Sequence, residues 1–147
     1  MTGQLASVDL RQGEYLVCPY SRTAKGIWVL DGKPVRLSET GTTAEQLGEA
    51  IDAALAQSRE GVEELTRDSQ PARPLLDLLQ VPDYATYAKG TRQVEVYRDG
   101  DTVELTPQRN EGGRRGFTPI DTHMQTLTNP SPYQLGTEVI TAFHKAV

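Results

Sequence analysis

The chain carries the stretch Thr43-Ala-Glu-Gln-Leu-Gly-Glu-Ala-Ile-Asp-Ala-Ala-Leu55 and repeats its pattern 88 positions later (134 − 46) as Ser131-Pro-Tyr-Gln-Leu-Gly-Thr-Glu-Val-Ile-Thr-Ala-Phe143. Each stretch begins with a hydroxyl residue suited to cap a helix, and Gln-Leu-Gly starts three residues later. Apolar side chains follow at the spacing of one helix face. The repeat predicts two amphipathic helices, over residues 43–58 and from Ser131 onward. We expect the glycine of each copy to let its helix approach a sheet closely.

Short apolar runs before both helices predict strands. The predicted strands cover residues 14–20, 27–30, 34–37, 93–97 and 102–106, with one or two more between 117 and 127. Asp31-Gly32 and Asp99-Gly100 are dipeptides that favour a hairpin turn. Because hairpins favour an antiparallel sheet, we expect an α+β fold. Its helices should pack on one face of the sheet, and two related strand-strand-helix halves should build it.

The middle of the chain differs from both halves. Residues 59–72 lose the apolar periodicity and predict a link with at most one irregular turn. Two short helices are predicted after it, over residues 74–79 and 83–90, the second capped by Asp83. We therefore expect a single domain over residues 1–147. Its half-repeats span about 14–58 and 91–147, and residues 59–90 join them.

Composition narrows the class of protein. A chain of 147 residues suits one domain, and such a domain buries about 68–70% of its unfolded surface. The formal net charge of −5 disfavours direct nucleic-acid binding, which usually shows a basic excess, and suits a basic protein partner. The lone Cys18 and the absence of a signal-peptide pattern predict a cytoplasmic protein. No apolar run is long enough to predict a membrane span.

No set of residues makes a convincing catalytic or metal site. Cys18 could be a nucleophile with His123 or His144 as its base, but it lies mid-strand, where free cysteine is usually a buried apolar residue. Asp121, His123 and Ser131 could form a hydrolytic triad, yet Ser131 is already explained as a helix cap. The chain has no metal-ligand spacing. We therefore expect no enzymatic activity, no cofactor and no metal.

Two loops resemble phosphate-binding sequences. Residues 26–33 imitate a P-loop but have one residue too many and a strand-like interior. The second loop runs from Arg109 to Gly116 and holds three arginines and three glycines. It has three interpretations: a solvated hairpin connection, a contact with a protein partner, or a contact with phosphate or RNA. The aromatic residues that single-strand binding would need are missing from it.

The densest group of acidic residues lies in the predicted link. It consists of Glu60, Glu63, Glu64 and Asp68. The group is either a solvated face or a docking surface for a basic partner, since complementary charge speeds association. Tyr20 precedes a polar turn and is the tyrosine that we expect to be exposed at a contact.

Several short motifs along the chain match those of one known protein family. They occur in the same order over roughly residues 14–143. The motifs are Val17-Cys-Pro-Tyr-Ser-Arg22-Thr with Ile27-Trp28, Leu47-Gly-Glu-Ala50 and Ala54-Leu55, Ser58-Arg-Glu-Gly61, Tyr84-Ala-Thr-Tyr-Ala-Lys-Gly90 and Val94, Leu105-Thr-Pro107 and Arg109-Asn110, the glycine-rich loop with Phe117, and Ser131 with Leu135-Gly136. Each motif is short, but together they resemble CdiI-type immunity proteins of bacterial contact-dependent growth inhibition systems.

The resemblance implies a cytoplasmic protein without catalysis of its own. Such a protein binds, in a 1:1 complex, the C-terminal toxin domain of its cognate CdiA-type effector and neutralises it. Many of these toxins are nucleases, often acting on tRNA, and an acidic inhibitor complements a basic substrate groove. The family supplies no binding residues, because these contacts vary with the toxin.

We expect toxin binding to involve the acidic group, the segment around Tyr20 and the arginine-glycine loop. The candidate residues are Glu60, Glu63, Glu64, Asp68, Tyr20, Arg22, Arg109, Asn110, Arg114 and Arg115. The alternative is an RNA- or phosphate-binding accessory protein that uses the Arg109–Arg115 loop.

Overall fold

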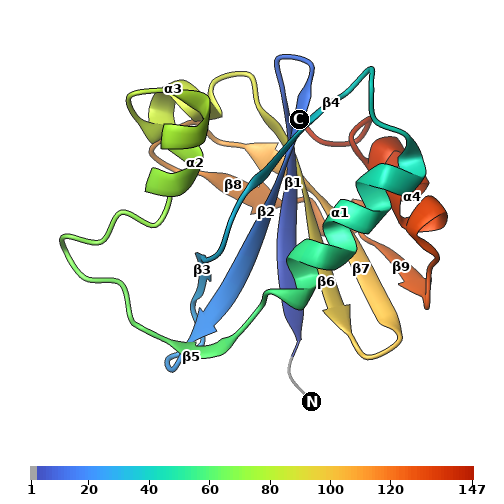
Figure 1. The fold of residues 1–147 in the computed structure, drawn as a ribbon, viewed down its shortest axis with the longest axis horizontal. Helices are drawn as coiled ribbons and strands as arrows, with labels where there is room; N and C mark the ends of the chain where they lie inside the picture. Colours follow the sequence, from blue (N-terminus) through green and yellow to red (C-terminus); the bar gives the residue numbers. More distant parts are fainter. Residues whose placement is uncertain (1–2) are drawn as a thin grey trace.

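The computed structural model describes residues 3–147, and within them one antiparallel-dominated sheet of nine strands forms the centre of the molecule (Figure 1). The strand order is β3-β2-β1-β6-β7-β8, with β4 and β5 also paired with β2, and β9 with β7. The strands are β1 (Gln4–Arg11), β2 (Glu14–Thr23), β3 (Trp28–Leu30), β4 (Val35–Ser38), β5 (Glu60–Val62), β6 (Arg92–Asp99), β7 (Thr102–Asn110), β8 (Phe117–Pro119) and β9 (Gln125–Thr128).

Helices complete the predicted α+β fold, which is confirmed. They are α1 (Ala44–Ala56), α2 (Arg73–Leu79), α3 (Tyr84–Ala88) and α4 (Pro132–Ala142), with a 3₁₀ turn at Asp121–His123. The Thr43 side chain accepts a hydrogen bond from the Gln46 N–H, and the Gln46 side chain accepts one from the Thr43 N–H, which is the capping box. No helix in residues 3–147 is long and apolar enough to cross a membrane.

The sequence pattern does not predict β1, although β1 is a central strand. It pairs with β2 on one side and with β6 on the other, both antiparallel. Ser7 and Asp9 are buried together with their apolar neighbours, because both faces of β1 are covered. Polar residues in buried positions do not stand out as strand residues in a sequence, which explains the omission.

The hairpin predicted at Asp31-Gly32 is wrong. β3 and β4 do not pair with each other; both pair antiparallel with β2, end to end, with Leu30 opposite Tyr20 and Val35 opposite Val17. Residues 31–34 leave the ladder beside Pro19. Proline has no N–H to donate, so the ladder is interrupted at this position.

Two further boundaries differ from the prediction. Residues 60–62 form β5, which pairs in parallel with the end of β2, rather than an unstructured link. The strand β7 runs on to Asn110, through residues predicted to be a loop, because β8 supplies it with a second partner. The hairpin at Asp99-Gly100 is confirmed: Asp99 pairs with Thr102, and Gly100 has a φ of 62°.

The two halves repeat with a constant offset that begins at β1. Gln4 and Arg92 open β1 and β6, and Ala44 and Pro132 open α1 and α4, each pair 88 positions apart (92 − 4 and 132 − 44). Where β1 pairs with β6, Ser7 lies opposite Glu95, its own counterpart in the repeat. The halves are therefore related by an approximate twofold axis that passes through this residue pair.

The repeated glycines bring the two long helices together, and not, as predicted, a helix and the sheet. A Cβ added at Gly48 of α1 would lie 1.8 Å from the carbonyl oxygen of Pro132. A Cβ added at Gly136 of α4 would lie 1.8 Å from the carbonyl oxygen of Ala44. The contact is reciprocal, as the twofold relation requires, and only glycine fits at either position.

The core has two layers, one on each face of the sheet. The larger layer lies beneath α1 and α4 and includes Val8, Val17 and Val94. The smaller layer uses the alternate residues of β2, Leu16 and Cys18, and is covered by the short helices α2 and α3. The expectation that helices cover one face thus holds for the two long helices, while the two short ones partly cover the other.

Candidate functional site

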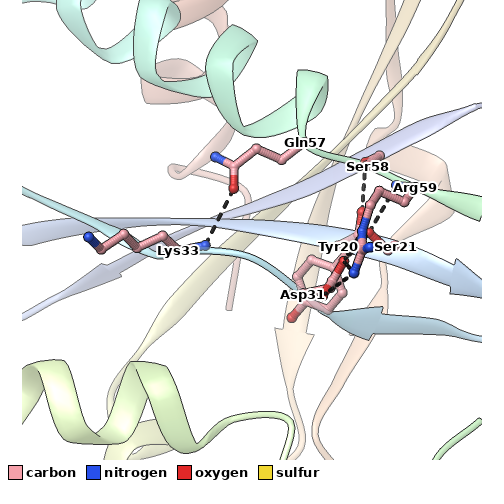
Figure 2. A network of polar contacts seen from close by, with 7 residues as sticks. All are labelled: Tyr20, Ser21, Asp31, Lys33, Gln57, Ser58 and Arg59. Carbon is pink, nitrogen blue, oxygen red and sulfur yellow. Dashed lines mark hydrogen bonds and ion pairs between the residues drawn. The ribbon is translucent and has the colours of Figure 1, made fainter. Parts of the chain in front are cut away.

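A polar network fixes the chain where it leaves α1 and turns into the acidic segment (Figure 2). The Ser58 hydroxyl accepts a hydrogen bond from the Leu5 N–H at 3.0 Å and lies 2.6 Å from the Tyr20 carbonyl oxygen. The Arg59 guanidinium donates two hydrogen bonds to Asp31, at 3.1 and 3.2 Å, and this contact lowers the pKa of Asp31. These bonds tie residues 58–59 to β1, β2 and the end of β3.

The acidic segment follows directly and joins the edge of the sheet. Glu60, the first residue of β5, pairs with Arg22 through hydrogen bonds of 2.8 and 3.1 Å. Glu64 accepts a hydrogen bond from the backbone N–H of Lys25 at 2.9 Å. Glu63 and Asp68 are exposed. We call Glu60, Glu63 and Glu64 the acidic edge.

Arg22 links the acidic edge to an aromatic residue. Its guanidinium lies 5.5 Å from the ring centre of Trp28, within cation–π range. Tyr20, predicted to be exposed, is instead half-buried and packs against the smaller core layer. The structure therefore brings Tyr20, Arg22 and the acidic edge to one corner of the molecule, where β2, β3 and β5 meet.

The arginine-glycine loop belongs to a different part of the molecule. It follows β7, which β1 and β6 separate from β2. Asn110 anchors the loop, because its amide donates hydrogen bonds to the carbonyls of Ala88 and Thr91 at 2.7 and 2.9 Å. Arg114 and Arg115 are exposed. The Nε of Arg109 lies 3.8 Å from the Oε1 of Glu111. The predicted contact residues thus form two groups that do not touch.

The candidate catalytic residues are not assembled. Cys18 is buried, and burial raises the pKa of its thiol, which disfavours the nucleophilic thiolate. Ser131 caps α4 by accepting a hydrogen bond from the Gln134 N–H at 3.1 Å, and it shares no hydrogen bond with Asp121 or His123. Across residues 3–147 no group of three or more His, Cys, Asp or Glu side chains could hold a metal ion.

A buried polar cluster on the second sheet face is absent from the sequence-based list. The Asp9 carboxylate accepts hydrogen bonds from the Tyr87 hydroxyl and, at 3.0 Å, from the Gln93 amide. Burial raises the pKa of Asp9 to about 6, although both hydrogen bonds favour the charged form. The signal in the sequence was the pair of polar residues, Ser7 and Asp9, that alternate with apolar ones in Leu5–Leu10.

Comparison with known proteins bears on the fold. No family profile matches the sequence, and no curated protein is significantly similar to it. A protein of unknown function from Neisseria meningitidis has a TM-score of 0.81 and 18% identity, covering 99% of this chain and 96% of that chain. A chain of the CdiA-CT/CdiI toxin and immunity complex from Yersinia pseudotuberculosis has a TM-score of 0.80 and 17% identity. That match covers 100% of this chain and 99% of the other.

Both similarities extend over the whole architecture. They include β1 and α2, which none of the short sequence motifs covers. The resemblance to CdiI-type proteins inferred from those motifs is therefore confirmed at the level of the fold, and the chain has the fold found in the CdiA-CT/CdiI toxin and immunity complex.

Proposed function

We propose that this chain is an immunity protein that binds and neutralises the C-terminal toxin domain of a cognate CdiA-type effector. The observation that carries the proposal is the shared fold over the full length of a chain from a toxin and immunity complex. The described residues also hold no assembled catalytic triad and no metal cluster, which suits a binding protein.

The proposed docking surface is the acidic edge together with Arg22. Glu63 is exposed, and the neighbouring glutamates are fixed by β5 and by the backbone of Lys25, so the edge presents ordered negative charge. Such a surface complements the basic groove of a nuclease, and we propose that the toxin is a nuclease that acts on tRNA. We also propose that the complex contains one copy of each protein and forms in the cytoplasm.

Co-expression tests this function directly. The toxin domain encoded immediately upstream should arrest growth when produced alone, and this chain should restore growth when produced with it. Purified chain and toxin domain should then elute as a 1:1 complex. Growth arrest that persists despite normal levels of the folded chain, with no complex on a sizing column, would refute the proposal.

A second candidate, an accessory protein that binds RNA or phosphate, is favoured by one feature. Arg114 and Arg115 are exposed in the loop whose glycines line a cavity of about 760 Å³, to which Lys89 and Arg92 also contribute. Replacing Arg109, Arg114 and Arg115 by alanine should abolish RNA binding if this function is correct. Absence of RNA binding by the unaltered chain at low salt would eliminate it.

A further inference from the structure

A cleft on the second face of the sheet lies beside the acidic edge. It consists of two adjoining cavities, of about 330 and 270 Å³, which share Tyr20 and Trp28 as walls. Its floor contains two cross-strand pairs of β1 and β6, Ser7 opposite Glu95 and Asp9 opposite Gln93. The larger cavity also shares Val29 and Leu30 with a third hollow lined by Glu60 and Glu63. The cleft and the acidic edge therefore form one continuous surface.

The floor of this cleft holds polar groups without partners. The Ser7 side chain is 2% exposed, and its hydroxyl makes no hydrogen bond with any of residues 3–147, although it lies close to the side chains of Asp9, Cys18 and Tyr20. Glu95 is half-buried and forms neither an ion pair nor a side-chain hydrogen bond with any of residues 3–147. A buried hydroxyl and a half-buried carboxylate usually have partners in a folded protein, so these two groups point to a partner that lies outside the chain.

Among residues 3–147, no cation pairs with Asp9 or Glu95. Arg22 is paired with Glu60 and lies against Trp28. Arg11 donates to the Tyr87 carbonyl oxygen at 3.2 Å and lies 5.6 Å from the centre of the Tyr87 ring. These two guanidinium groups are thus engaged elsewhere, and the carboxylates of Asp9 and Glu95 have no positively charged partner among residues 3–147.

The walls and the floor together define the missing group. Aromatic rings flanking a carboxylate attract a cation, and a flat guanidinium stacks on such rings better than an ammonium does. A guanidinium also carries enough N–H donors to reach the Glu95 carboxylate and the Ser7 oxygen at once. We propose that this cleft receives an arginine side chain of the protein partner. The assignment of that partner rests on the proposed immunity function.

The first test needs no partner. Ethylguanidinium is titrated into the chain at low ionic strength, and ethylurea serves as a neutral probe of nearly the same shape. We expect saturable NMR shifts of the Trp28 indole N–H and of the Ser7 and Glu95 amides with ethylguanidinium alone. In Glu95→Gln the affinity should fall at least about fivefold, because the charged acceptor is gone. Glu49→Gln, on an exposed position of α1, should keep the affinity of the unaltered chain.

Equal shifts with ethylurea, or equal affinity in Glu95→Gln, would overturn the proposal. Ser7→Ala gives a second variant, which removes the hydroxyl and should also weaken ethylguanidinium binding. Circular dichroism and the melting temperature of each variant establish that it is folded before its titration is interpreted.

The second test uses the toxin domain. In Glu95→Gln the dissociation rate of the complex should rise by at least about tenfold, while Glu49→Gln leaves it unchanged. If Glu95→Gln binds the toxin domain as tightly as the unaltered chain, the cleft proposal is wrong and the immunity function stands. If ethylguanidinium binds but the toxin complex is unaffected, the cleft holds small cations, which also overturns the proposal. If the unaltered chain does not bind the toxin domain, the immunity function itself fails.

Discussion

The charge of Asp9 depends on its burial. Asp9 lies on the central strand, accepts hydrogen bonds from Tyr87 and Gln93, and has no cationic partner among residues 3–147. Neutral donors offset only part of the desolvation of a carboxylate, so the pKa rises to about 6. A residue with a raised folded-state pKa favours folding at low pH and loses that contribution as the pH rises through the folded value.

Replacing Asp9 should change the pH dependence of stability. The pKa of Asp9 rises from 3.8 to about 6 on folding. This shift makes the folded state about 3 kcal/mol more stable below pH 4 than at pH 7 and above. Asp9→Asn cannot lose this contribution. Between pH 4 and pH 7 the free energy of unfolding of the variant should therefore rise relative to that of the unaltered chain. Urea unfolding at several pH values measures the difference. A difference that stays constant with pH would show that Asp9 has an ordinary pKa.

Ser58 is the residue that joins α1 to two strands. Its hydroxyl accepts a hydrogen bond from the Leu5 N–H and lies 3.2 Å from the Leu5 carbonyl oxygen. It also lies 2.6 Å from the Tyr20 carbonyl oxygen (Figure 2). Ser58→Ala leaves partly buried backbone groups without a partner, and we expect it to cost about 1–3 kcal/mol of stability. Ser38→Ala removes an exposed hydroxyl that water can replace, so it should cost much less. Equal costs in the two variants, measured by urea unfolding, would contradict this role.

At the scale of elements, α1 and α4 are in backbone contact. Gly48 and Gly136 allow the two helices to cross at the distance of backbone contact. The sequence predicted both helices and their caps correctly, because caps and apolar periodicity are local. It did not predict that the helices contact each other. The repeated pattern shows that each helix has a packing face, but not which element packs against that face.

Substituting either glycine should separate the helices. In Gly48→Ala the added methyl group would clash with the Pro132 carbonyl oxygen, and the backbone cannot yield as a flexible side chain would. We expect a loss of about 2–4 kcal/mol in the free energy of unfolding, in the range of disruptive core substitutions. Gly41→Ala is the control, because a Cβ there would meet only Ser38 atoms at 3.5 and 3.6 Å. Equal stability of the two variants would mean that the helix crossing adapts without cost.

At the scale of the whole molecule, the two halves form one structure. β1 pairs with β6 across the approximate twofold axis, and the larger core layer draws on both halves. What lies outside the repeat is residues 59–90, which supply β5, the second-face helices and the acidic edge. The repeat therefore builds the sheet and the larger core layer, and the segment between the copies supplies the surface that we propose for partner binding.

The proposed docking surface predicts a kinetic effect of charge. Glu63→Lys combined with Glu64→Lys should slow association with the toxin domain, by about tenfold or more at low salt, because complementary charge steers encounter. The slowing should diminish as the ionic strength rises. Glu45→Lys with Glu49→Lys makes the same charge change on α1, which covers the other face of the sheet, and should slow association much less. If both pairs slow it equally, only net charge matters and the acidic edge is a solvated face.

The sequence alone determined the features that neighbouring residues decide. The capped helices at Thr43 and Ser131, the short helix at Asp83, the hairpin at Asp99-Gly100 and the α+β class all follow from local hydrogen bonding and periodicity. These signals act within a few residues, so they can be read without knowing the rest of the fold.

Only the tertiary structure decided the features that depend on distant partners. β3 and β4 share one partner strand because Pro19 interrupts its ladder, and β5 exists because the end of β2 offers it a free edge. Ser7 and Glu95 become one site because β1 and β6 place them opposite each other. Strand pairing and burial are set by residues far apart in the chain, and that is why the cleft could not be found from the sequence.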